Sequence, residues 1–264
     1  MIINEKIKEK LPIKDINNYY VVTDFDRTIT NDTSNTSWSI LASSDLVPKS
    51  YINERQKLYK KYRPIELDET MDFDKRSALV SEWFKNHIEL FIKYRISEEI
   101  FAQVGSDLRI MEFRKGAKEF LQFLNKNNIP LIIISAGIGN FIESFLKKHD
   151  CLFDNIYISS NKIIFTDNVA TGVDKNIIHS LNKNEVLLPF LIQKQLQNKS
   201  DVILLGDQIS DLKMIDKNNN KQIIKVGFYS SRTETSIIEF QNAFDIVCLE
   251  NDNYNTLSKV LFKR

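Results

Sequence analysis

Short, continuously apolar runs alternate with longer helical patterns along most of this chain of 264 residues. Such runs are typical of strands that helices cover on both faces, so they predict a mainly parallel sheet. The alternation favours a doubly wound α/β fold. The expected strands are YYVVTDF (19–25), IPLIIIS (129–135), NIYISS (155–160), DVILLGD (201–207), QIIKVGF (222–228) and DIVCLE (245–250).

The segments between these runs have the apolar periodicity of amphipathic helices. The clearest are GAKEFLQFLNKNN (116–128), NFIESFLKKHD (140–150), EVLLPFLIQKQLQN (185–198) and TETSIIEFQNAF (233–244). A weaker segment, NKIIFTDNVATG (161–172), is interpreted as a small hairpin or loop on the core.

One block breaks the alternation. Residues 33–112 contain no convincing strand but three helical patterns, at 51–62, 73–94 and 97–108. Open α/β sheets bind ligands at the carboxyl ends of their strands, so a helical insertion directly after the first strand would cover that edge. We therefore expect an α/β core formed by residues 1–32 and 113–264, and an inserted helical cap formed by residues 33–112.

The charge balance limits the classes of partner. The 36 Lys and Arg nearly match the 35 Asp and Glu, and the formal charge is +1, which argues against a nucleic-acid polymer or an anionic membrane. No apolar run approaches the roughly 18 residues that a membrane span needs. We expect a cytoplasmic protein, a monomer or weak homodimer, that acts on a small molecule. Cys151 and Cys248 lie in apolar stretches and are interpreted as reduced core thiols.

The first expected strand ends on two carboxylates. In YVVTDFDRT, Asp24 and Asp26 are separated by one phenylalanine, and Thr28 follows. Carboxylates are costly to bring together at the edge of an apolar core unless another charge offsets their repulsion. Asp207 and Asp211, in LLGDQISD, end another strand. If these residues meet, Asp24, Asp207 and Asp211 would surround a divalent cation, and ligands made only of oxygen favour Mg²⁺.

Two further signals suit a phosphate group. Ser135 ends the second strand, and the small residues Ala136 and Gly137 after it leave backbone N–H groups open to an anion. Lys183, in HSLNKNE, is the preferred phosphate-binding lysine, and Lys175 is its competitor.

Together these residues suit phosphoryl transfer. Asp24 would attack phosphorus in line and form an aspartyl-phosphate. Asp26 would protonate the leaving alkoxide and afterwards activate water. Ser135 and Lys183 would hold the other phosphoryl oxygens. The competing interpretations are structural: turn residues for the aspartates, a strand terminator for Ser135 and a solvated surface charge for either lysine.

The order DxDxT, serine, lysine and GDxxxD resembles the four motifs of the haloacid dehalogenase superfamily. The resemblance implies a Rossmann-like core with a cap, and the second aspartate of the first motif is typical of phosphatases and phosphomutases. It implies Asp24 as nucleophile and Asp26 as acid/base. It also implies metal-site residues Asp24, Asp26, Asp207 and Asp211, and phosphate-binding residues Thr28, Ser135, Ala136, Gly137 and Lys183.

A narrower resemblance is to the cytosolic type III 5'-nucleotidases, also called pyrimidine 5'-nucleotidases. It rests on SAGIGNFIESF, IIHSLNKN, ILLGDQISDLKM and IIKVGFYSSRTE, and on KLYKKYRPIELDETM and VSEWFKNH in the cap. It runs from about Tyr19 to Leu249 and implies Mg²⁺-dependent hydrolysis of nucleoside 5'-monophosphates, mainly UMP or CMP. Glu66 in PIELDE would read the base and Phe84 in EWF would stack on it, whereas Trp83 is interpreted as core.

The chain departs from that family at Arg27, where a less polar residue is usual, around Asn86 and His87, where the helix is one residue shorter, and in residues 31–45. These differences bear on substrate choice more than on phosphoryl chemistry. Two alternatives stay open: a phosphatase for another small phosphomonoester, such as a phosphoamino acid or a sugar phosphate, and a non-catalytic regulatory homologue.

Overall fold

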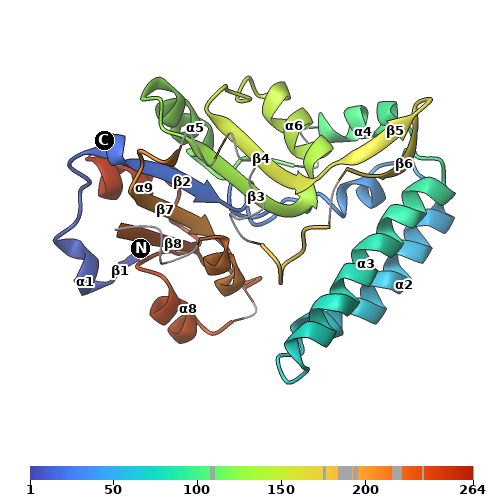
Figure 1. The fold of residues 1–264 in the computed structure, drawn as a ribbon, viewed down its shortest axis with the longest axis horizontal. Coiled ribbons are helices and arrows are strands. Elements are labelled where there is room, and N and C mark those ends of the chain that lie inside the picture. The colour runs from blue at the N-terminus through green and yellow to red at the C-terminus, as the bar shows by residue number, and fades with distance from the viewer. Residues whose placement is uncertain are drawn as a thin grey trace.

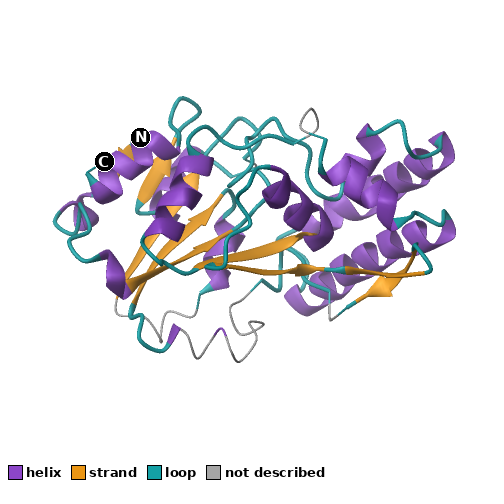
Figure 2. Ribbon diagram, turned by 90° about the horizontal axis from the view of Figure 1, so that it is seen from above, coloured by secondary structure: helices purple, strands orange, loops and turns teal. Residues whose placement is uncertain are grey.

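A seven-stranded sheet lies at the centre of the molecule, with helices around it (Figures 1 and 2). The structure is a computed structural model that describes residues 1–107, 111–174, 177–183, 192, 196–215, 222–233 and 235–263. Only β1 runs antiparallel to its neighbour, and the other strands are parallel. The predicted α/β fold with a mainly parallel sheet is confirmed. The order is β1 (Ile2–Ile3), β9 (Ile246–Cys248), β8 (Gln222–Phe228), β7 (Asp201–Gly206), β2 (Tyr19–Thr23), β3 (Leu131–Ile138) and β4 (Ile156–Asn161).

Strand β2 is buried on both faces because its residues alternate between two apolar layers. Tyr19 and Val21 pack into the larger core, together with α5 (Ala117–Lys126), α6 (Gly139–Lys148) and α9 (Tyr254–Phe262). Tyr20 and Val22 pack into the layer on the opposite face, which includes residues of η4 (Ile209–Met214). This two-residue period explains why the strand reads as a continuous apolar run. The helix expected at 185–198 lies largely outside the described residues.

The stretch between β2 and α5 is helical. It contains η2 (Ile40–Ser43), α2 (Lys49–Leu67), α3 (Phe73–Lys93) and α4 (Glu98–Gly105), and its described residues form no strand. Helices α2 and α3 lie side by side at one end of the molecule (Figure 1), and the Tyr62 and Trp83 rings stack between them with centroids 6.2 Å apart. The Asp72 carboxylate caps α3 by accepting from the Lys75 backbone N–H at 2.9 Å. The expected boundaries of a core and a cap stay a prediction.

Helix α4 joins this helical stretch to the sheet. The Phe101 ring of α4 stacks on Phe141 of α6, with ring centroids 4.4 Å apart. Gly105 allows the close approach, because a Cβ there would lie 2.9 Å from the Ser144 Cβ. The hairpin expected near 161–172 is present as β5 (Ile163–Thr166) and β6 (Val169–Val173).

Several elements were not expected from the sequence. They are β1, η1 (Ile16–Asn18), η2, η4 and α9, and β3 is longer than expected. A short helix, α1 (Glu5–Lys8), lies near the N-terminus. Helix α8 (Ile237–Ala243) is shorter than its predicted segment and begins at a capping box formed by Ser236 and Glu239. Cys151 and Cys248 are both free and buried. Among the described helices, none combines the length and apolar character that crossing a bilayer requires.

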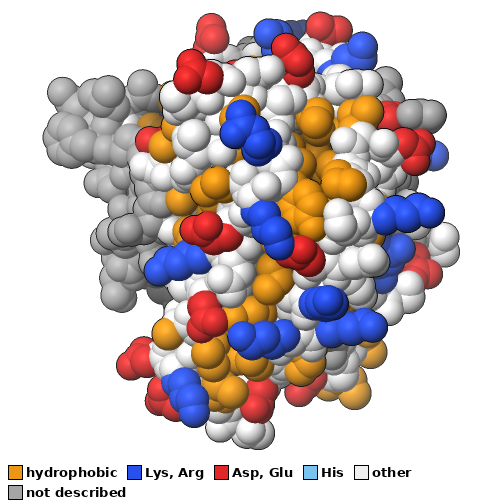
Figure 3. All heavy atoms as spheres, turned by 90° about the vertical axis from the view of Figure 1, so that its right-hand side faces the viewer, with side chains coloured by type: hydrophobic (Ala, Val, Ile, Leu, Met, Phe, Trp, Pro, Cys, Tyr) orange, Lys and Arg blue, Asp and Glu red, His pale blue; other side chains and the backbone are white. Residues whose placement is uncertain are grey.

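The outer face of α2 and α3 carries mixed charge. Figure 3 views the molecule from the side that is on the right in Figure 1, and shows basic and acidic side chains interspersed with apolar ones. The basic run KLYKKYR (57–63) lies on α2 and is followed by the acidic ELDE. The visible part of this face therefore presents no patch of a single sign that would attract a polyanion.

Candidate active site

The register of the sheet brings the carboxyl ends of three strands together. Thr23, the last residue of β2, pairs with Leu205 of β7, so Asp24 and Asp207 follow on adjacent strand ends. The Asp24 backbone N–H donates to the Leu205 carbonyl at 3.0 Å. Strand β3 flanks β2 on its other side and carries Ser135. The predicted convergence of these residues at one edge of the sheet is therefore observed.

Three carboxylates form a compact group at this edge. One oxygen from each of Asp24, Asp207 and Asp211 lies within 4.8 Å of the others. Asp211 is fixed by the backbone, because the N–H groups of Asp207 and Gln208 donate to its Oδ2 at 3.1 and 3.0 Å. Gly206 makes room for it, since a Cβ at that position would lie 2.6 Å from Asp211 Oδ2.

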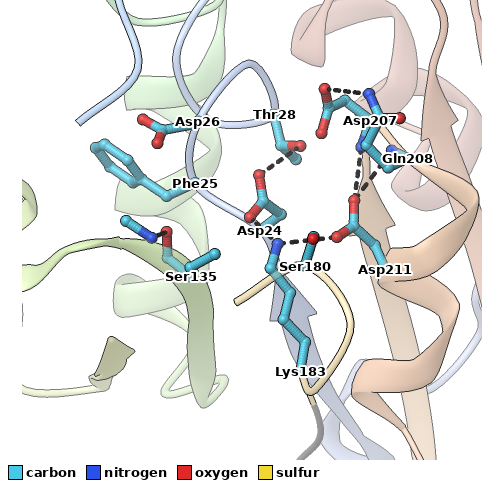
Figure 4. A network of polar contacts seen from close by, with 12 residues as sticks. Asp24, Phe25, Asp26, Thr28, Ser135, Ser180, Lys183, Asp207, Gln208 and Asp211 are labelled. Carbon is cyan, nitrogen blue, oxygen red and sulfur yellow. Dashed lines mark hydrogen bonds and ion pairs between the residues drawn. The ribbon is translucent and has the colours of Figure 1, made fainter. Parts of the chain in front are cut away.

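Lys183 lies against the same group (Figure 4). Its Nζ donates to Asp24 Oδ1 at 2.5 Å and to Asp211 Oδ1 at 2.9 Å. Its side chain is almost fully buried, so it is not the solvated surface charge of the structural alternative. Its competitor, Lys175, lies outside the described residues.

The electrostatics of the group leave negative charge to be balanced. Burial raises the pKa of Asp24 well above its usual range, although the Lys183 ammonium opposes the shift. Burial, together with the charge of Asp211, raises the pKa of Asp207 to about 6. One ammonium does not offset three carboxylates, of which two are buried and that of Asp207 is half-buried. Donors made only of oxygen suit a hard divalent cation. The residues present therefore fit Mg²⁺.

Asp26 lies apart from these carboxylates (Figure 4). Its oxygens accept from Ser37, through the backbone N–H at 3.0 and 3.1 Å and through the hydroxyl at 2.8 Å. Burial raises the pKa of Asp26 above its usual range, and the Ser37 hydrogen bonds oppose that shift. The structure thus places the Asp26 side chain outside the group of carboxylates that fits a cation, and the metal role expected for Asp26 stays a prediction.

Of the residues expected to bind phosphate, Lys183 and Thr28 contact Asp24, and the others line the cleft beside it. The Ser135 hydroxyl accepts from the Gly137 N–H at 3.0 Å, and the Thr28 hydroxyl donates to Asp24 Oδ2 at 3.4 Å. Ser135, Ala136 and Gly137 all line the cleft above the carboxylates, whereas Thr28 is buried beneath it.

That cleft has a volume of about 1450 Å³ and runs between the strand ends and helices α2 and α3. Its floor includes Asp24, Lys183 and Asp207, and its lining from the helices includes Glu66 and Phe84. It therefore has room for a substrate considerably larger than phosphate.

Glu66 lies in the last turn of α2 rather than in a loop, even though Pro64 is inside the helix. Its carboxylate accepts from the Ser180 hydroxyl at 2.5 Å and pairs with the Arg63 guanidinium. Ser180 precedes Lys183 by three residues, so Glu66 contacts the segment that carries the buried lysine.

Phe84 and Trp38 form an aromatic wall of the cleft, with ring centroids 4.8 Å apart. The Trp38 indole N–H donates to the Ala136 carbonyl at 2.7 Å, and its own carbonyl accepts from Arg55 Nε at 3.1 Å. His87 lies beside the wall, and burial lowers its pKa to about 3, so its ring is neutral at physiological pH.

Sequence reasoning missed Ser37, Trp38 and Arg55. The first two lie in NDTSNTSWS, where no pattern separates one serine from the others. Arg55 lies in a helical segment rich in charge, and the sequence does not distinguish this partly buried arginine from fully solvated ones. Trp83, interpreted as core, is buried and also lines the cleft.

Comparison with known proteins agrees with this geometry. The family model described as Pyrimidine 5'-nucleotidase (UMPH-1) matches residues 21–263. The chain belongs to this family. The resemblance inferred from the motifs is thereby confirmed, as are the classes phosphatase and 5'-nucleotidase.

The matches to related proteins cover most of the chain. The 7-methylguanosine phosphate-specific 5'-nucleotidase of Mus musculus is 32% identical over 91% of this chain and 83% of the mouse protein. Its counterpart in Drosophila melanogaster is 29% identical over 88% of this chain and 75% of the fly protein.

Solved structures show the same fold. A crystal structure of cytosolic 5'-nucleotidase IIIB bound to cytidine has a TM-score of 0.84 and 28% identity, and the match covers 96% of this chain and 88% of that chain. A substrate-bound phosphoserine phosphatase, 15% identical with a TM-score of 0.57, matches 91% of this chain and 96% of its own. The fold is that of haloacid dehalogenase hydrolases.

Proposed function

We propose that this chain is a Mg²⁺-dependent phosphatase that hydrolyses nucleoside 5'-monophosphates through an aspartyl-phosphate intermediate. The observation that supports it most is the group of Asp24, Asp207 and Asp211 beside Lys183, on the floor of a cleft large enough for a nucleotide. Mg²⁺, when bound by these carboxylates, would neutralise charge on the phosphoryl oxygens.

The proposed reaction gives each of these side chains one role. An oxygen of Asp24 attacks phosphorus, the bond to the nucleoside oxygen breaks, and that oxygen keeps the electron pair and takes a proton from Asp26. Asp26 then removes a proton from water as the water oxygen attacks phosphorus and the bond to Asp24 breaks. Lys183 and the Ser135 hydroxyl hold the remaining phosphoryl oxygens, with Ala136 and Gly137 beside them in the lining of the cleft.

The base would lie against the aromatic wall formed by Phe84 and Trp38, with Glu66 as a hydrogen-bond acceptor. Pyrimidine nucleotides, UMP and CMP, are the first candidates. The cytidine complex of the related structure supports them. Burial lowers the pKa of Arg55 beside this wall, and no carboxylate of the described chain pairs with it. An unpaired cation here favours a neutral base.

7-Methylguanosine monophosphate is a second candidate, because several relatives carry it in their names. Its base is cationic, and aromatic rings attract cations. Arg55 opposes such a base, and the negative charge of Glu66 is already offset by Arg63. We therefore propose that CMP is used better than the methylated purine nucleotide.

A panel of phosphomonoesters tests the proposal. Phosphate release is measured with Mg²⁺ for CMP, UMP, 7-methylguanosine monophosphate, phosphoserine and a sugar phosphate. We expect the highest kcat/KM with a nucleotide. The Asp24→Asn variant should lose at least about 10³-fold in kcat because the nucleophile is removed, while its fold is kept.

Two outcomes would count against this proposal. Equal use of nucleotides and the other esters would favour a phosphatase for another small phosphomonoester. The same trace activity in the wild type and in Asp24→Asn would favour a non-catalytic homologue.

A further inference from the structure

Asp26 owes its position to a residue of the segment that leads toward α2. Among the described residues, Ser37 supplies all the hydrogen bonds to the Asp26 carboxylate, through its N–H and its hydroxyl. Asp24, two residues earlier, is held instead by Lys183 and Thr28. The two aspartates of the first motif are thus oriented by different parts of the chain.

Ser37 is itself fixed to the end of β3. It is 1% exposed, and its hydroxyl oxygen accepts from the Ile138 N–H at 3.1 Å while its hydrogen goes to Asp26. Gly137 has to lack a side chain here, because a Cβ would lie 2.1 Å from Ser37 Oγ. The hydroxyl therefore has one donor and one acceptor in defined directions, and little freedom to rotate.

The two carboxylate oxygens of Asp26 accept different numbers of hydrogen bonds. Oδ2 accepts from both the hydroxyl and the N–H of Ser37, whereas Oδ1 accepts from the N–H alone. Oδ1 therefore keeps the capacity to carry a proton while Oδ2 stays bound. The same contacts orient the carboxyl group in its protonated and its ionised form.

We infer that Ser37 is the positioning residue of Asp26, and that it aims Oδ1 at the leaving oxygen of the substrate. The inference rests on the proposed function, which gives Asp26 the proton. In the transfer step the phosphorus–oxygen bond to the leaving group breaks, its electron pair stays on that oxygen, and the proton moves from Asp26 Oδ1 to it. A misdirected Asp26 leaves this oxygen to depart unprotonated.

The neighbouring residue connects this acid to the rest of the cleft. Trp38 is bound to the Ala136 carbonyl through its indole and to Arg55 of α2 through its carbonyl. In the dipeptide Ser37–Trp38, the serine therefore hydrogen-bonds the proposed acid, Asp26, and the tryptophan forms part of the aromatic wall.

Leaving groups of different basicity test the inference. For Ser37→Ala and the wild type, kcat/KM is measured with Mg²⁺ on a nucleotide, whose alkoxide needs a proton, and on p-nitrophenyl phosphate, whose phenolate leaves without one. We expect Ser37→Ala to lose about 10- to 100-fold on the nucleotide, part of the range for a placed acid, and less than about threefold on the aryl ester. The quantity kcat/KM is used because it excludes the later step in which Asp26 activates water.

Two further variants complete the test. Ser43→Ala removes an exposed hydroxyl from the same segment, outside the cleft. It should leave kcat/KM unchanged on both esters. Ser37→Cys keeps a similar shape with a weaker donor and should fall between Ser37→Ala and the wild type on the nucleotide.

Equal losses on both esters, or none on the nucleotide, would overturn the positioning role. The result is separable from the proposed function, which is judged by the substrate preference of the wild type. If that preference is for a sugar phosphate, the same ratio is measured with it, because its leaving group is also an alkoxide.

Discussion

At the scale of single residues, the site consists of polar groups that are buried together with their partners. Lys183 shares its ammonium between Asp24 and Asp211. The buried, neutral ring of His179 likewise has a hydrogen-bond partner for each of its two nitrogens. Its Nδ1 accepts from the Leu181 N–H at 3.3 Å, so its Nε2 carries the hydrogen and donates to the hydroxyl of Ser81 at 2.9 Å.

The buried histidines should make the stability of the protein depend on pH. Burial lowers the pKa of His87 to about 3 and that of His179 to about 4, whereas an unfolded histidine titrates near 6.5. Below that pH the unfolded state binds more protons, so stability is lost as the pH falls from about 6.5 toward 4, by up to about 1.4 kcal/mol per pH unit for each histidine. Replacing either by glutamine should reduce this slope.

Urea unfolding at several pH values between 7 and 5 measures the slope. His149→Gln is the control, because the His149 ring is only partly buried and its pKa is lowered less. An unchanged slope in both His87→Gln and His179→Gln would mean that neither ring is kept neutral by the fold.

At the scale of elements, the strands were predictable and the long-range contacts were not. The runs predicted at 19–25 and 201–207 contain β2 and β7. They were recognisable because strands buried on both faces are apolar along most of their length. β1 was missed because two residues carry no periodicity, and its pairing with β9 joins distant parts of the chain. Asp24, Asp207 and Lys183 were found from strand ends and motifs, whereas Ser37 is defined only by its contacts.

The packing of α4 on α6 gives a prediction at this scale. In an isolated helix, Gly→Ala stabilises by about 1 kcal/mol. At Gly105 the added Cβ would lie 2.9 Å from the Ser144 Cβ and 3.2 Å from the Phe141 ring. Overpacking of this kind costs about 1 to 3 kcal/mol, so Gly105→Ala should be destabilising overall.

Gly172→Ala is the matched control, because a Cβ there meets no atom within 4 Å. Thermal unfolding of both variants gives the comparison. If Gly105→Ala were as stable as Gly172→Ala, the result would contradict the close packing of α4 against α6 at Gly105.

At the scale of the whole molecule, the helices above the cleft contact the loop that carries the buried lysine. Glu66 of α2 bonds to Ser180, and Ser81 of α3 bonds to His179. The Lys213 ammonium also lies 4.7 Å from the centre of the Phe73 ring of α3. We propose that residues 33–112 act as a cap, which excludes water while Asp24 attacks and admits it for hydrolysis.

The most direct test of the central claim is the identity of the residue that receives the phosphoryl group. The wild type is acid-quenched during turnover of CMP with Mg²⁺, and its peptides are analysed by mass spectrometry. The account predicts a phosphoryl group on Asp24 that is absent when EDTA replaces Mg²⁺. A phosphoryl group on any other residue, or turnover without one on Asp24, would contradict it.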